Sequence, residues 1–174
     1  GIYEAKINGV RVGDLVMMPG WTEYAHRLQY QTYDVTSMLT ENNVIEIGAG
    51  HGWYASRMGT PKTTNGFYGD IPSVIAALKV TYEDGSEELI LTDESWKAAS
   101  SEVLQSQIYD GETMDARIIP EFNTEKKDEL IAVASNKKNA AAVGIVGKIR
   151  NAIAKNPQSH CGFSHISLRI FTTT

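Results

Sequence analysis

Aromatic and planar polar side chains occur together in two glycine-containing stretches of the sequence, and these residues are the best suited to bind a ligand. Both stretches read as loops or strand ends, where binding residues are common. Sugars lay their C–H faces on Trp and Tyr rings, and their hydroxyl groups hydrogen-bond to planar polar side chains. The set therefore fits a carbohydrate ligand. The candidate residues are Trp21, Tyr24, Arg27, His51, Trp53, Tyr54 and Asp70.

The same aromatic rings have a second interpretation that needs no ligand. Large rings at the ends of a β-sandwich often close the hydrophobic core, and in this interpretation Trp21 and Trp53 do so. Both interpretations stay open at the level of the sequence, because ring type alone does not reveal which face is buried.

Two acidic residues lie close together in Asp110-Gly111-Glu112, and a pair of carboxylates can act as general acid and base. Asp and Gly are also the usual residues of a tight turn, in which the Asp side chain bonds nearby backbone. We therefore expect a turn here, and no catalytic residue in this chain.

Residues that could bind a metal ion are too scattered to predict a site. Histidine and cysteine show no zinc-ligand spacing on a common element. Calcium prefers several oxygen ligands, which would have to come from dispersed residues such as Asp70 and Asp110. No cofactor is predicted, and calcium is left open but unsupported.

The first 92 residues have the pattern of antiparallel β-structure. Ile2–Ile7 alternates apolar and polar residues, and Asn8-Gly9 then supplies a type I′ turn into Val10–Val12. Ser73–Tyr82 and Glu87–Thr92 predict a second hairpin. Short strands joined by such turns predict a mainly β fold, an antiparallel sandwich. Other expected elements are strands at 29–35, 43–47 and 163–171 and a short helical turn at 35–39.

The last third of the chain differs in charge and in pattern. Residues 1–122 contain 8 Lys and Arg against 18 Asp and Glu, whereas residues 123–174 contain 8 against 3. Apolar residues spaced by three or four predict an α-helical segment from Thr124 to about Asn156. We therefore divide the chain into a β-sandwich over 1–122 and a basic, helix-rich tail over 123–174. The tail either packs on the sandwich or is a segment foreign to it.

Composition excludes two classes of partner and leaves the compartment open. The acidic body lacks the clustered Lys and Arg that bind nucleic-acid phosphates. No run of 18 apolar residues exists, so no membrane span is expected. Cys161 is the only cysteine and permits no intrachain disulfide. Periplasmic, extracellular and cytoplasmic locations are all compatible with this sequence.

Four segments in series resemble a known family, the substrate-recognition β-sandwich domain near the N-terminus of bacterial α-L-rhamnosidases. The resemblance covers about residues 1–120 and stops there. Its segments are Pro19–Val35, Gly52–Tyr54, Thr92–Lys97 and Ile108–Arg117.

The resemblance implies a jelly-roll-like sandwich that recognises substrate without catalysing its hydrolysis. In that family the catalytic acids belong to a separate, larger helical-barrel domain, so cleavage of terminal α-L-rhamnose is expected of the parent enzyme only. The expected partners are a rhamnose-containing glycan and the other domains of that enzyme. The alternative is a structural module that packs between domains and binds no sugar.

The chain also departs from the family pattern. Some rhamnose-binding modules of this enzyme class use calcium through neighbouring Asp and Asn side chains, and this sequence contains no Asp-Asn pair. The strand that normally precedes the Ile2–Ile7 segment, and the strand expected after Phe122, are not recognisable in the sequence.

Overall fold

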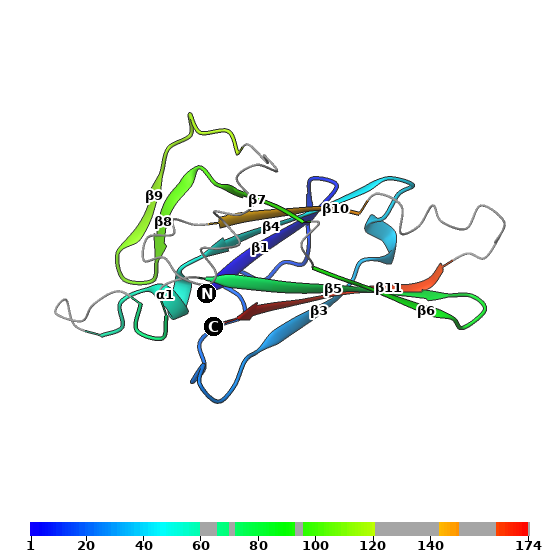
Figure 1. Ribbon diagram of the computed structural model, residues 1–174, viewed down its shortest axis with the longest axis horizontal. Coiled ribbons are helices and arrows are strands. Elements are labelled where there is room, and N and C mark those ends of the chain that lie inside the picture. Colours follow the sequence, from blue (N-terminus) through cyan, green and yellow to red (C-terminus); the bar gives the residue numbers. More distant parts are fainter. Residues whose placement is uncertain (60–65, 70–71, 93–95, 121–142, 150–162, 174) are drawn as a thin grey trace.

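The computed structural model describes residues 1–59, 66–69, 72–92, 96–120, 143–149 and 163–173. Within them the fold is mainly β, and every strand-to-strand ladder is antiparallel. Two large sheets lie one above the other, and a small hairpin stands at one end (Figure 1). The predicted antiparallel sandwich is confirmed.

The first large sheet has five strands, ordered β2-β1-β4-β10-β7. Their bounds are β2 Val10–Arg11, β1 Ile2–Ile7, β4 Asn43–Gly50, β10 Val143–Ile149 and β7 Lys97–Ser100.

The second large sheet has four strands, ordered β3-β11-β5-β6, and the small sheet pairs β8 with β9. Their bounds are β3 Tyr30–Asp34, β11 Phe163–Thr173, β5 Ser73–Tyr82, β6 Glu87–Leu91, β8 Val103–Gln107 and β9 Gly111–Met114. Two short helical turns connect strands: a 3-10 turn at Thr36–Met38 and α1 at Gly52–Ala55.

The hydrophobic core lies between the two large sheets and follows the alternation of the strands. Ala76, Leu78 and Val80 of β5 are buried, as the period of two predicts, whereas Ile75 is half exposed. Removing these apolar side chains from water supplies the main favourable free energy of the fold. The opposing sheet contributes Ala5, Ile7, Ile45, Ile47 and Ala49, and β11 contributes Ile166, Leu168 and Ile170.

Both predicted hairpins are confirmed. Asn8 and Gly9 have φ angles of 53° and 78°, as a type I′ turn requires. The Asn8 side chain accepts a hydrogen bond from Val44 N and donates one to the buried Asn43, so the turn is joined to the neighbouring strand. β5 and β6 pair in continuous register around the second turn. The helical turn expected at 35–39 is the 3-10 turn.

The structure corrects the prediction for the tail. Val143–Ile149 is strand β10, where apolar spacing predicted a helix, and β11 confirms the terminal strand predicted at 163–171. β10 lies between β4 and β7, and β11 lies between β3 and β5. Pairing on both sides satisfies the backbone polar groups of these strands, which outweighs a weak local helical preference. Other residues of the predicted helix lie outside the described residues, and a domain boundary at residue 122 stays a prediction.

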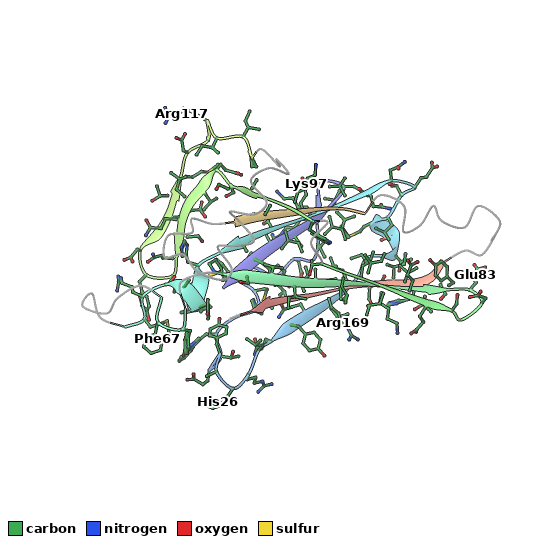
Figure 2. The ribbon with its side chains drawn as sticks, in the orientation of Figure 1. His26, Phe67, Glu83, Lys97, Arg117 and Arg169 are labelled. Carbon is green, nitrogen blue, oxygen red and sulfur yellow. The ribbon has the colours of Figure 1, made fainter. Side chains whose placement is uncertain are left out.

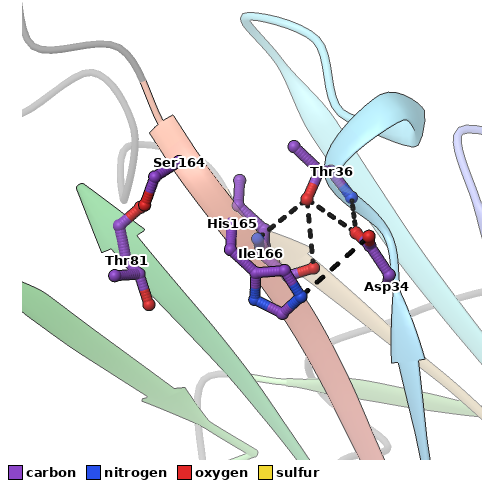
Figure 3. A network of polar contacts seen from close by, with 6 residues as sticks. All are labelled: Asp34, Thr36, Thr81, Ser164, His165 and Ile166. Atoms are coloured by element: carbon purple, nitrogen blue, oxygen red, sulfur yellow. Dashed lines mark hydrogen bonds and ion pairs between the residues drawn. The ribbon is translucent and has the colours of Figure 1, made fainter. Parts of the chain in front are cut away.

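Side-chain hydrogen bonds fix β11 between its neighbours (Figure 3). Ile166 N donates to Thr36 Oγ1 at 2.8 Å, and the Thr36 hydroxyl donates to Asp34 Oδ1 at 2.6 Å. On the other side, Ser164 Oγ donates to the Thr81 carbonyl at 3.2 Å. The register of β11 is therefore set by contacts to β5 and to the 3-10 turn that follows β3, as well as by its apolar alternation.

Candidate functional site

Three tyrosines form a tight cluster where the chain loops around α1. The ring centroids of Tyr24 and Tyr54 are 5.5 Å apart, and those of Tyr24 and Tyr68 are 5.0 Å apart, both edge to face. Tyr24 and Tyr54 are only 5% and 6% exposed. Burial, with a smaller contribution from Tyr68, raises the pKa of Tyr24 to about 12. Its hydroxyl therefore stays protonated and donates to the Gly20 carbonyl at 3.2 Å.

Two exposed aromatic rings adjoin this cluster. Trp21 is 55% exposed and Phe67 is 58% exposed. Trp21 Nε1 donates to the Tyr68 hydroxyl at 3.1 Å, and the Phe67 ring packs edge to face on Tyr68 with centroids 4.8 Å apart. Tyr68 therefore connects both exposed rings to the buried pair. We call Trp21, Tyr24, Tyr54, Phe67 and Tyr68 the aromatic cluster.

Backbone geometry around α1 allows this close packing. Gly52 begins α1 with φ of 48°, and a Cβ there would meet Ile2 at 2.5 Å, so only glycine fits. α1 then carries Trp53, which is half-buried against the cluster, and Tyr54. A Cβ at Gly69 would overlap the Tyr54 hydroxyl. Gly52 therefore lets α1 begin close against Ile2, and Gly69 leaves room for the Tyr54 hydroxyl.

The structure brings four of the seven predicted site residues together. Trp21, Tyr24 and Tyr54 are in the aromatic cluster, and Trp53 packs against it. For Tyr24 and Tyr54 burial supports the core interpretation, because a ligand has no access to their ring faces. Trp21 has the exposure that a ligand-binding ring needs.

The remaining three predicted residues, Arg27, His51 and Asp70, are not members of the aromatic cluster. Arg27 is exposed at the end of the turn that includes His26, and its backbone carbonyl accepts a 2.6 Å hydrogen bond from Thr22 Oγ1. His51 is half-buried just before α1, where its carbonyl accepts hydrogen bonds from Tyr54 N and Ala55 N. Figure 2 shows His26 and Phe67 at the same end of the molecule. Asp70 lies outside the described residues.

Asp110 is engaged in an ion pair with Arg57. Arg57 Nε donates to its two carboxylate oxygens at 3.0 and 2.9 Å, and Arg57 Nη2 donates to Oδ1 at 2.7 Å. These hydrogen bonds hold the pKa of Asp110 below its usual range. The Arg57 guanidinium also lies 5.2 Å from the centre of the Tyr109 ring. The turn between β8 and β9 spans residues 108–110, so Asp110 lies in it as predicted, whereas Gly111, with φ of 78°, and Glu112 belong to β9.

The parts of the chain that the structure describes hold no group of three or more His, Cys, Asp or Glu side chains arranged to bind a metal ion. Asp110, one of the two oxygen donors considered for calcium, is paired with Arg57. Among the same residues, none of the helices has the length and apolar character that crossing a membrane requires.

Sequence reasoning missed two groups of residues. Phe67 and Tyr68 stand between two glycines in Gly66-Phe67-Tyr68-Gly69, and this aromatic pair was a usable signal for the cluster. The Arg57–Asp110 pair joins residues 53 positions apart. Ion pairs between residues so far apart in the sequence form only because the fold brings them together, so no local sequence pattern predicts them.

Comparisons with known proteins identify the family of this domain. Residues 1–151 match the family model described as the Alpha-L-rhamnosidase N-terminal domain. An α-L-rhamnosidase of Streptomyces avermitilis is 43% identical over 118 residues, which is 67% of this chain and 11% of that protein. One of Formosa agariphila is 37% identical over 134 residues, which is 74% of this chain and 14% of that protein.

A solved structure is also similar to this chain in its fold. The crystal structure of an α-L-rhamnosidase from Aspergillus terreus is 46% identical and superimposes with a TM-score of 0.65, covering 67% of this chain and 14% of that one. This chain thus spans less than one sixth of the length of these relatives. By both sequence and fold, the chain belongs to the family of α-L-rhamnosidase N-terminal domains.

Proposed function

We propose that this domain recognises rhamnose-containing glycans on behalf of a longer α-L-rhamnosidase and does not hydrolyse them itself. The observation that carries the proposal is the pair of exposed rings, Trp21 and Phe67, held on a buried tyrosine cluster. Exposed rings on a rigid base bind sugar faces at low entropic cost, because little side-chain freedom is lost. Arg27, exposed six residues after Trp21 in the chain, offers hydrogen-bond donors for hydroxyl groups.

The relatives described above support the link to rhamnose, since all three are α-L-rhamnosidases. The hydrolytic activity is proposed for the parent protein. The ion pair between Asp110 and Arg57 supports this assignment, because it gives Asp110 a structural partner within this domain.

Isothermal titration calorimetry tests the proposal directly. The chain is titrated with L-rhamnose and with a rhamnogalacturonan oligosaccharide, first with calcium and then with a chelator. We expect saturable binding that Trp21→Ala weakens at least about tenfold, or roughly 1.4 kcal/mol. Trp21→Phe should retain part of the affinity, because it keeps a ring and loses only the hydrogen bond to Tyr68.

Met114→Ala is the matched control, because Met114 on β9 is as exposed as Trp21, both at 55%. Its affinity should equal that of the unmodified chain. Trp53→Ala measures how much the half-buried Trp53 ring contributes to the sugar affinity, separately from Trp21. Loss of binding in chelator would show that calcium takes part in sugar binding. We expect the chain alone to release no rhamnose from these ligands.

The second candidate function is packing against other domains without sugar binding. Leu15, Val16 and Met17 favour it, since these three consecutive apolar side chains are each at least half exposed. The absence of any binding heat, in a protein shown to be folded by circular dichroism, would replace the recognition proposal with this one.

A further inference from the structure

β6 leaves one backbone edge unpaired within the described residues, where it pairs with β5 alone. Exposed strand edges are templates for pairing with another chain, and proteins usually protect them. Two other edges of the large sheets are short: β2 has two residues, and β7 has four, beginning with Lys97. β3 places the exposed charge of Asp34 on its edge.

β6 lacks these protective features. It is five residues long, contains no Pro or Lys, and pairs with β5 in unbroken register from Leu91 to Glu87. Its two acids are bound within its own hairpin. Glu87 forms an ion pair with Lys79 at 2.7 Å, and Glu88 accepts a 2.7 Å hydrogen bond from the Tyr82 hydroxyl.

Two of the three outward-facing side chains of β6 are apolar, and the third is Glu87. Leu89 and Leu91 are 59% and 50% exposed, and Ile75 of the adjoining β5 is half exposed. Apolar side chains beside an open edge add burial to any backbone pairing that forms there. β6 therefore has both the backbone groups and the side chains of an interaction surface.

We infer that a second copy of this chain pairs its β6 with β6, antiparallel, about a two-fold axis at Leu89. Every ladder between strands of the described fold is antiparallel, and a two-fold axis makes the same surface serve both partners. In this register Leu89 lies opposite Leu89, and Glu87 lies opposite Leu91. No like charges are directly opposed, so the strand is complementary to itself. Two four-stranded sheets would become one sheet of eight strands.

Sedimentation equilibrium over a series of protein concentrations tests the inference. We expect a monomer–dimer equilibrium for the chain and a monomer for Leu89→Lys, because two ammonium groups would then meet at the axis. Leu89 is exposed, so this variant should fold like its parent. Leu104→Lys, a charge placed at an exposed position on β8, is the matched control and should still dimerise.

Cysteine cross-linking tests the register without relying on repulsion. In a Cys161→Ser background, Leu89→Cys places two thiols directly opposite across the axis, within reach of a disulfide. Leu91→Cys faces Glu87 and should cross-link far less. A chain that stays monomeric at every concentration, a dimer that survives Leu89→Lys, or equal cross-linking at both positions would overturn the inference.

Discussion

β10 and β11 both come from the last third of the chain and both are inner strands, yet only β11 is recognisable from its sequence. In β11 the buried Ile166, Leu168 and Ile170 alternate with Ser167 and Arg169. In β10 the residues Val143, Val146 and Ile149 recur every three positions, which is the spacing of a helix. The difference shows that an inner strand is specified by its neighbours as much as by its own pattern.

Deletion of residues 123–174 is expected to have the largest effect on folding. It removes β10 and β11 together, which leaves β3 and β7 without the partners that join them to their sheets. We expect no cooperative thermal unfolding and little soluble protein, measured by circular dichroism and size-exclusion chromatography. A deletion product that unfolds cooperatively would instead support a tail foreign to the sandwich.

Leu168→Ala measures the core contribution of β11. Leu168 is 1% exposed, and its truncation should lower the free energy of unfolding by roughly 2–5 kcal/mol in urea denaturation. Ile47→Ala, in the opposing sheet, is equally buried and should cost a similar amount. A loss below about 1 kcal/mol for Leu168→Ala alone would mean that β11 contributes pairing without packing.

Thr36→Val isolates the hydrogen bonds that fix β11. The substitution keeps the side-chain shape and leaves Ile166 N without its 2.8 Å acceptor. We expect a loss of roughly 1–3 kcal/mol, because an unsatisfied buried donor costs more than a hydrogen bond contributes. Thr36→Ser retains the hydroxyl and should recover most of that difference. Equal stability of the Val and Ser variants would show that this contact is dispensable.

Asp110→Asn gives the smallest expected effect and concerns the small hairpin instead of the large sheets. Arg57 lowers the pKa of Asp110 in the folded state, so the ion pair adds stability above the ordinary Asp pKa of about 3.9. That stability disappears as pH falls through the lower pKa of the folded state. Melting temperatures of the two proteins should therefore differ near pH 6, converge in acid, and approach one another in high salt. A constant difference across pH would contradict this account.

Much of the fold could be predicted from local sequence. Asn8-Gly9 and the alternation of Ser73–Tyr82 act over a few residues, so their hairpins were recognisable. β10 was not, because a short apolar run suits either a helix or an inner strand, and only its pairing with β4 and β7 decides between them.

The candidate site was predicted in part for a similar reason. The aromatic types of Trp21 and Tyr54 identified the region, but exposure depends on the loops around each ring. Tyr54 is buried because Tyr24 packs on it from a distant loop, whereas Trp21 stays accessible. Tyr68 was overlooked although it connects these rings, since a connecting role has no residue-type signal.

The position of β11 between β3 and β5 also sets an order in time for the growing chain. The ribosome completes β3 at Asp34, and β11 begins only at Phe163. At synthesis rates of roughly 5–20 residues per second, β3 waits on the order of ten seconds for its partner. Hairpins such as β5–β6 can form in that interval, but neither β3 nor β7 has its neighbour. The nascent domain must therefore keep its half-built sheets from pairing with other chains until its last strand emerges.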